Sequence, residues 1–209
     1  MLEQYVRQYY QHYFVDHLAV MVGKKMTPLQ ITMLGGLVGC MVPVAIYYRQ
    51  PLFAVFLLLM SGLLDTLDGT VARIKNQVSD MGSLLDIFID RLVEFAVIFG
   101  IWVYAPFDRS LMCLLMLGSI FLCVTSFLTV GIFSQNDSHK SFYYSPGIME
   151  RPEAFIFFAC MILLPDYFFM LSLVFAILVI LTTIQRICEF YLLYSRRPAD
   201  TTAACLRDV

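Results

Sequence analysis

Long apolar segments are the feature of this sequence that most limits its fold. The hydrocarbon core of a bilayer is about 30 Å thick, and a helix needs roughly 20 apolar residues to cross it. Six segments approach that length, near residues 28–48, 51–73, 83–105, 110–134, 152–165 with an extension at its N-terminal side, and 167–194. Only helices and closed barrels satisfy the backbone inside hydrocarbon, and continuous runs without alternation exclude a barrel. The sequence therefore predicts an all-α polytopic membrane protein with six transmembrane helices.

The composition agrees with this class. Of the 209 residues, 60% are hydrophobic and 14% are charged, and the mean hydropathy is +0.77. We expect a single membrane domain over 1–209, with an interfacial amphipathic helix over 1–22, a six-helix bundle over 28–194 and a flexible tail over 195–209. The six cysteines are not spaced for a zinc site, and a net charge of −2 does not suggest binding to nucleic acid.

The Lys and Arg residues of the loops predict the orientation, because cytoplasmic loops carry an excess of both. One set of helix ends holds only Arg49 and Arg109. The opposite set, with the two termini, holds Arg7, Lys24, Lys25, Arg73, Lys75, Lys140, Arg151, Arg196, Arg197 and Arg207. Both termini are therefore expected on the cytoplasmic side.

Four aspartates stand in the second and third apolar segments, in D-T-L-D-G-T-V-A-R and, eight residues later, in G-S-L-L-D-I-F-I-D. Carboxylates in membrane-spanning segments are costly and point to function. Residues three or four apart share a helix face, so Asp65 and Asp68 project together, as do Asp86 and Asp90. Two antiparallel helices that turn these faces toward each other would present four acids to one cavity.

Clustered carboxylates without His or Cys favour a hard cation, Mg²⁺ or Mn²⁺. A pair of such ions would neutralise acids that could not otherwise stay ionised so close together. Arg73, at the polar end of its helix, is suited to a phosphate. In the alternative interpretation the four acids form structural pairs with Arg73, Lys75 and Arg91.

The pattern D-x2-D-G-x2-A-R-x8-G-x3-D-x3-D resembles the signature of the CDP-alcohol phosphotransferase family, and every fixed position is filled. The divalent-metal ligands that the resemblance implies are Asp65, Asp68, Asp86 and Asp90. The residues implied to contact CDP are Asp65, Gly69, Ala72, Arg73 and Gly82. Asp90 would also be the base that activates the acceptor hydroxyl.

The same resemblance implies the reaction and its setting. The phosphatidyl group of CDP-diacylglycerol would pass to a small alcohol, with release of CMP, in phospholipid biosynthesis. The protein would be a homodimer in a bacterial inner membrane, with its active site on the cytoplasmic side. Two other classes stay open as alternatives: a magnesium-dependent membrane prenyltransferase and an ion-coupled transporter.

In the segment from Asn136 to Glu153, His139, Lys140 and Arg151 bring positive charge to the face of the expected active site. Members of the family with a phosphorylated acceptor, such as phosphatidylinositol-phosphate synthases, carry basic residues near the start of the fifth helix. Lys140 and Arg151 are therefore candidate acceptor ligands, and they favour a polyol phosphate such as glycerol 3-phosphate or inositol phosphate. Ordinary enrichment of cytoplasmic loops in basic residues explains them equally well.

Three further features carry expectations. Thr27 and Pro28 are typical of a helix start, and three glycines after them allow close helix packing, namely Gly35, Gly36 and Gly39. Glu94 continues the row of acids and either lines an acceptor pocket or pairs with Arg91 or Arg186. Arg186 and Glu189, three residues apart, are expected to pair with each other.

Overall fold

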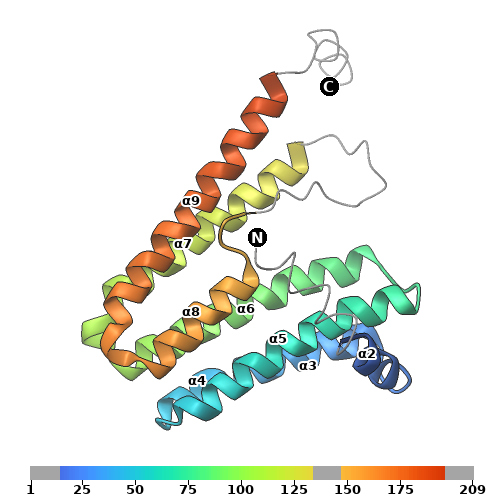
Figure 1. Ribbon diagram of the computed structural model, residues 1–209, viewed down its shortest axis with the longest axis horizontal. Coiled ribbons are helices and arrows are strands. Elements are labelled where there is room, and N and C mark those ends of the chain that lie inside the picture. The colour runs from blue at the N-terminus through green and yellow to red at the C-terminus, as the bar shows by residue number, and fades with distance from the viewer. Residues whose placement is uncertain (1–14, 134–146, 196–209) are drawn as a thin grey trace.

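The computed structural model describes residues 15–133 and 147–195, which form helices and contain no strand (Figure 1). The all-α prediction is confirmed. The elements are α2 (Asp16–Gly23), α3 (Pro28–Cys40), α4 (Val42–Tyr47), α5 (Pro51–Ile74), α6 (Asp80–Tyr104), α7 (Pro106–Phe133), α8 (Arg151–Leu163), the short 3₁₀ helix η2 (Pro165–Tyr167) and α9 (Phe168–Ser195).

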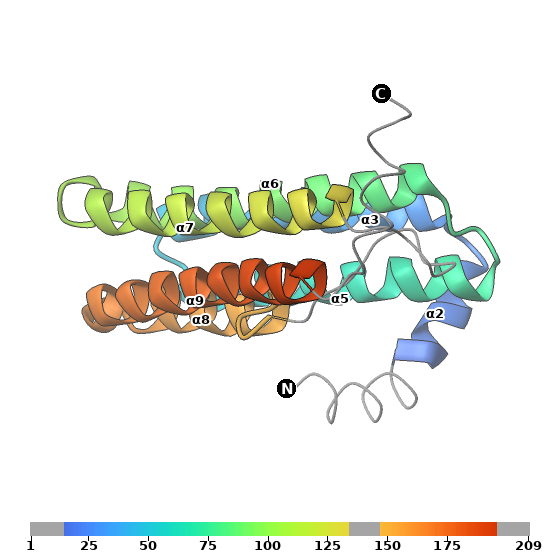
Figure 2. The same ribbon diagram turned by 90° about the horizontal axis from the view of Figure 1, so that it is seen from above.

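The helices form two groups that share one end of the molecule. The pairs with the most extensive contacts are α7 with α9 and α3 with α5. In Figure 1 the α7–α9 pair diverges from α5 and α6 as it leaves the shared end, and α8 lies between the two groups. Figure 2 shows α6 and α7 in one layer, with α5, α8 and α9 in the other.

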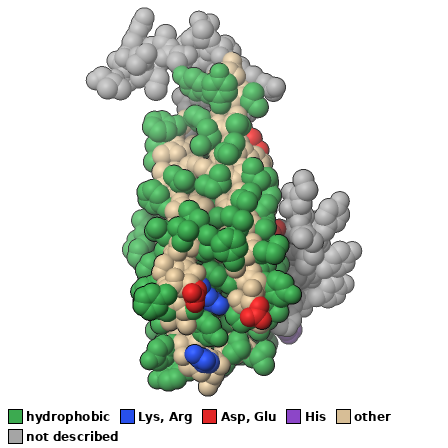
Figure 3. Space-filling model, turned by 90° about the vertical axis from the view of Figure 1, so that its left-hand side faces the viewer, with side chains coloured by type: hydrophobic (Ala, Val, Ile, Leu, Met, Phe, Trp, Pro, Cys, Tyr) green, Lys and Arg blue, Asp and Glu red, His purple; other side chains and the backbone are tan. Residues whose placement is uncertain are grey.

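Four segments are long and apolar enough to cross a membrane: Pro28–Tyr47, Pro51–Ile74, Pro106–Phe133 and Pro165–Leu192. The surface drawn in Figure 3 is mostly hydrophobic, as contact with lipid requires. Helix α6 has sufficient length, with 25 residues, but it carries the acids. Helix α8 has 13 residues and rises about 20 Å, which is short of the hydrocarbon thickness. The count of six spans stays a prediction.

Two boundaries differ from expectation. The expected N-terminal extension of the fifth segment is absent from the described residues, because a capping box between Glu150 and Glu153 starts α8 at Arg151. The first segment, predicted as one helix over 28–48, is divided at Met41 into α3 and α4. Pro43 lacks a backbone N–H and so interrupts the hydrogen-bond pattern of α3.

The start of α3 and its glycines agree with the prediction. The Oγ1 atom of Thr27 accepts from the Gln30 amide, and Gln30 Oε1 accepts from the Thr27 amide at 2.9 Å. Gly39 lies so close to α6 that a Cβ there would be 2.8 Å from Val93 Cγ1. Ser61 Oγ of α5 donates to the Gly35 carbonyl at 2.9 Å. Helix α3 therefore packs closely on α5 and α6, the two helices that carry the acids.

Helix α2 packs on the acid-bearing end of α5. Val15 and Ala19 are buried with Leu67 and Val71 of α5. Lys75, just after α5, donates its Nζ to the Met26 carbonyl at 2.9 Å. Residues 1–14 of the expected interfacial helix and residues 196–209 of the expected tail lie outside the described residues.

Candidate catalytic and metal site

Helices α5 and α6 bring three of the four predicted aspartates together. One carboxylate oxygen each of Asp65, Asp68 and Asp86 lies within 4.8 Å of the others. The helices are antiparallel because a short turn joins them (Figure 2). At the end of this turn Ser79 Oγ accepts from the Gly82 amide at 3.1 Å and caps α6. The i,i+3 and i,i+4 spacings of the sequence thus do place the acids on facing sides.

The aspartates fit a hard divalent cation. Asp68 is only 6% exposed, and its Oδ2 atom has no hydrogen-bond partner within residues 15–133 and 147–195. Carboxylates as close together as those of Asp65, Asp68 and Asp86 would repel one another if they were ionised without a cation. The group offers oxygen atoms alone, without histidine or cysteine, and Mg²⁺ and Mn²⁺ prefer this donor set.

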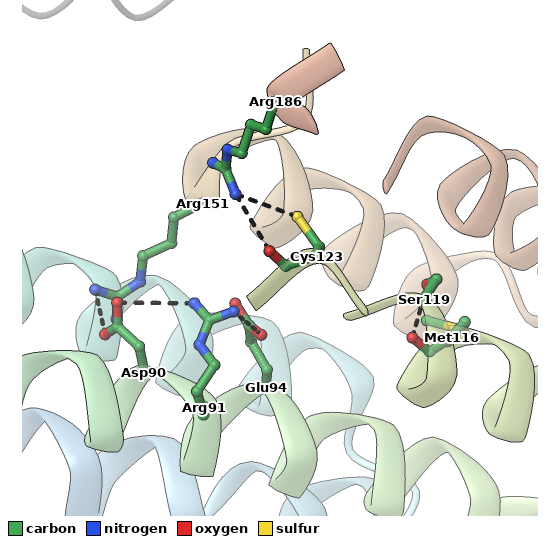
Figure 4. A network of polar contacts seen from close by, with 8 residues as sticks. All are labelled: Asp90, Arg91, Glu94, Met116, Ser119, Cys123, Arg151 and Arg186. Atoms are coloured by element: carbon green, nitrogen blue, oxygen red, sulfur yellow. Dashed lines mark hydrogen bonds and ion pairs between the residues drawn. The ribbon is translucent and has the colours of Figure 1, made fainter. Parts of the chain in front are cut away.

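Asp90 lies outside this group of three and pairs with an arginine from a distant helix. Arg151, the first residue of α8, forms an ion pair through Nη1 with Asp65. The same Nη1 atom forms a second ion pair with Asp90 Oδ1 at 2.6 Å (Figure 4). Its guanidinium also lies over the ring of Phe155, 5.2 Å from the centroid. The arginine that the sequence analysis selected as an acceptor ligand therefore contacts the acids directly.

Glu94 extends the row of acids along α6. Its Oε2 atom lies 2.8 Å from Nη1 of Arg91, so pairing with Arg91 is confirmed among the alternatives for this residue. Nη2 of the same arginine lies 4.0 Å from Asp90 Oδ2. Asp90 is thus placed between two guanidinium groups, as Figure 4 shows.

Arg186 of α9 has a different partner from the predicted one. It does not pair with Glu189, which accepts instead from Gln185 at 2.8 Å. Its Nη1 atom donates to the carbonyl and the Sγ atom of Cys123 in α7, at 3.5 and 3.4 Å. The Nε atom is buried without a hydrogen-bond partner in the described part of the chain. Figure 4 shows Arg186 reaching toward Cys123 and Arg151 reaching toward Asp90.

Residues 147–149, directly before Arg151, contact α9 near Arg186. The Met149 amide donates to Thr182 Oγ1 of α9 at 2.9 Å. A Cβ at Gly147 would lie 3.6 Å from Nη2 of Arg186. The sequence did point to Arg186, because it is a cation inside an apolar segment. Spacing along one helix, however, could not show that the Arg186 side chain contacts α7.

The predicted CDP ligands lie toward the turn between α5 and α6. Among the described residues, a Cβ at Gly69 would find only Arg73 Nη1 within 4 Å, at 3.7 Å, so the backbone there is open to approach. Arg73 is exposed and donates to Thr70 Oγ1 at 3.1 Å. Ala72 is half-buried on the same helix, and Gly82 lies in the first turn of α6. Lys140, the other predicted acceptor ligand, lies outside the described residues.

Comparisons with known proteins agree with the motif. Residues 25–185 match the family model described as CDP-alcohol phosphatidyltransferase. The inner membrane protein YnjF of Escherichia coli (strain K12) is 32% identical over 176 residues, which cover 79% of this chain and 84% of that protein. Archaetidylinositol phosphate synthase of Pyrococcus horikoshii is 37% identical over 75 residues, which cover 36% of this chain and 40% of that protein.

Crystal structures of Mycobacterium tuberculosis phosphatidylinositol phosphate synthase share the fold. The complex with CDP-DAG superimposes with a TM-score of 0.69 at 20% identity and covers 85% of this chain and 94% of that one. The complex with manganese and citrate gives a TM-score of 0.68 at the same identity, with 85% and 87% covered. Since the family model spans most of the chain and includes every residue of the aspartate motif, this chain belongs to the CDP-alcohol phosphatidyltransferase family, membrane enzymes that transfer a phosphatidyl group from CDP-diacylglycerol to an alcohol in phospholipid biosynthesis.

Proposed function

We propose that the acceptor of this transferase is a polyol phosphate, such as glycerol 3-phosphate or inositol phosphate. The observation that carries the proposal is the position of Arg151, whose guanidinium lies between Asp65 and Asp90. An acceptor whose phosphate binds this arginine would have its hydroxyl groups beside Asp90. The names of two relatives, archaetidylinositol phosphate synthase and phosphatidylinositol phosphate synthase, support a phosphorylated polyol.

Asp65, Asp68 and Asp86 would hold one divalent ion, Mg²⁺ or Mn²⁺, which would supply positive charge to the pyrophosphate and to the departing CMP. The manganese complex of the solved relative supports such an ion. The sequence predicts a second ion with Asp90 among its ligands. Arg151 places its positive charge there in this structure, so binding of a second ion would require Arg151 to release Asp65 and Asp90.

Asp90 would act as the general base. Its carboxylate takes the proton of the acceptor hydroxyl as that oxygen attacks the phosphorus that bears diacylglycerol. The bond between this phosphorus and the bridging oxygen breaks, and CMP leaves with the bonding electrons. Arg91 and Arg151 contact the Asp90 carboxylate from two sides and would orient it toward the acceptor hydroxyl. Positioning and charge stabilisation supply most of the acceleration in such transfers.

Other residues would bind the CDP part of the donor and the phosphate of the acceptor. Gly69, Ala72, Arg73 and Gly82 would contact the CDP part, and the open space beside Gly69 supports close approach of a nucleotide. Arg186 would join Arg151 and Lys140 in binding the acceptor phosphate. Its buried Nε, which has no partner among the described residues, supports this role.

A panel of acceptors tests the proposal. Purified protein, CDP-diacylglycerol and Mn²⁺ are assayed for CMP release with glycerol 3-phosphate, inositol phosphate, and the dephosphorylated glycerol and inositol. We expect release with a phosphorylated acceptor, and Arg151→Gln and Arg186→Gln should raise KM for that acceptor by about tenfold or more. The exposed Arg73→Gln variant is the comparison, because it should change KM for CDP-diacylglycerol instead. Faster release with the unphosphorylated alcohols would refute the assignment.

Membership in the family decides against the prenyltransferase and the transporter that the sequence left open. The cytoplasmic orientation of the termini and of the site, and the homodimer implied by the resemblance, stay predictions. Labelling of single cysteines from either side of the membrane, and the mass of the protein in detergent, would test them.

A further inference from the structure

A second polar feature lies at the end of the bundle opposite the aspartates. A cavity of about 220 Å³ is found where the α4–α5, α6–α7 and α8–η2 connections meet. Arg49, Tyr104 and Arg109 form its polar wall, and apolar side chains such as Ile46 and Met161 form the remainder. Helix α5 starts beside the cavity at Pro51 and rises about 21 Å before it reaches Asp65. The cavity is therefore separate from the catalytic site.

Arg109 is fixed in this cavity with hydrogen-bonding capacity unused. It is 8% exposed, and its guanidinium lies between the rings of Tyr104 and Phe168, 4.7 and 4.6 Å from their centroids. Nη1 donates to the Ile101 carbonyl at 3.5 Å, which uses one of five N–H groups. Among the described residues no carboxylate forms an ion pair with it, although Asp108 is its neighbour in the chain. A buried guanidinium that no carboxylate contacts is costly, which points to an anion from outside the chain.

Arg49 reaches the same tyrosine from another connection. Its guanidinium lies 5.6 Å from the centroid of Tyr104, and its backbone has φ 55°, a conformation that is uncommon for residues other than glycine. Two guanidinium groups thus flank one ring. Figure 3 faces this end of the molecule, where positive and negative side chains interrupt a hydrophobic surface. Within the described ranges neither arginine is in an ion pair with Asp108 or Asp166, so the two like charges are left for a shared anion.

We propose that this cavity binds the phosphate of an anionic phospholipid from the leaflet opposite the aspartates. The two guanidinium groups would donate to the phosphate oxygens, as arginine commonly does. The apolar wall would contact the glycerol and the first carbons of the acyl chains. A free phosphate ion has no such groups and could not make these contacts. The surface nearby supplies more apolar contact, since Leu52 and Phe107 are 77% and 100% exposed. A lipid held here would tie three helix connections together and stabilise the bundle.

Lipid binding by the whole protein tests this inference independently of the acceptor. Protein stripped of lipid is titrated with phosphatidylglycerol, phosphatidylcholine or inorganic phosphate, and bound lipid and the apparent melting temperature are measured. We expect phosphatidylglycerol to bind and to stabilise, with little effect of the other two. Arg49→Gln should weaken this binding about tenfold and Arg49→Lys less, because lysine cannot bind a phosphate in a bidentate manner. Gln50→Ala is the matched control and should bind like the wild type.

Arg49 is exposed and distant from the aspartates, so CMP release by Arg49→Gln should equal that of the wild type and thereby verify its folding. Three results would overturn the inference. The first is equal binding of phosphatidylglycerol and phosphatidylcholine. The second is undiminished phosphatidylglycerol binding by both Arg49→Gln and the double variant with Arg109→Lys. The third is displacement of the lipid by inorganic phosphate at equal concentration, which would make the site one for a free anion.

Discussion

Asp68 allows a direct test of whether the acidic group holds a cation. The side chain is 6% exposed, and its Oδ2 atom lacks a hydrogen-bond partner in the described part of the chain. The ion pairs of Arg151 go to Asp65 and Asp90 and leave Asp68 out. Without a divalent ion this buried carboxylate should therefore destabilise the fold. Asp68→Asn keeps the shape of the side chain and removes its charge.

The magnitude follows from the burial of this group. An unsatisfied buried polar atom costs about 1–3 kcal/mol. A gain of about 2 kcal/mol in a chain of this size corresponds to a rise of about 4–8 °C in melting temperature. With Mn²⁺ at a thousand times its Kd, the wild type gains about 4.1 kcal/mol, and the variant, which has lost a ligand, gains much less. The order of the two stabilities should therefore reverse when the ion is added.

The assay is thermal unfolding of both proteins in detergent, followed by the fluorescence of Trp102, with EDTA or with MnCl₂. The variant should melt above the wild type in EDTA and below it in Mn²⁺. Asp166→Asn, an exposed acid at the other end of the bundle, is the control and should respond to Mn²⁺ like the wild type. If Asp68→Asn is less stable than the wild type in EDTA and Mn²⁺ stabilises both equally, Asp68 is a structural acid and the metal site fails.

Four further variants test the base and the packing. Asp90→Asn should lower CMP release by at least about a hundredfold while CDP-diacylglycerol still binds; release at the wild-type rate would remove Asp90 from the base role. Gly39→Ala places a Cβ 2.8 Å from Val93 Cγ1 and should cost about 1–3 kcal/mol in thermal unfolding. Gly118→Ala, whose new Cβ has no atom of the described residues within 4 Å, should cost nothing, and equal losses in both would contradict the packing argument. Phe158→Ala empties a fully buried position and should cost about 3–5 kcal/mol, as a chemical unfolding series would show.

Neighbours in the chain were sufficient to predict most of the helices and the grouping of three aspartates. The second segment, expected over 51–73, is α5 over Pro51–Ile74, because Pro51 starts it and the apolar run sets its length. The third, expected over 83–105, starts earlier at Asp80, since Ser79 caps it. The spacing of the aspartates fixes which face of α5 and α6 each one occupies. A short turn then leaves the two faces opposite each other, so Asp65, Asp68 and Asp86 meet as predicted.

What only the tertiary structure decided is the placement of the arginines. From the sequence, Arg151 could be proposed only through a resemblance, and Arg186 was expected to pair with a residue of its own helix. In the structure Arg151 contacts Asp90 and Arg186 contacts Cys123. The pairing of Arg109 with Tyr104 and Phe168 likewise joins residues from separate helices. The physical reason is the range of the interactions. Helix formation and side-chain spacing depend on residues a few positions apart, whereas an ion pair between helices depends on how every helix packs against the others.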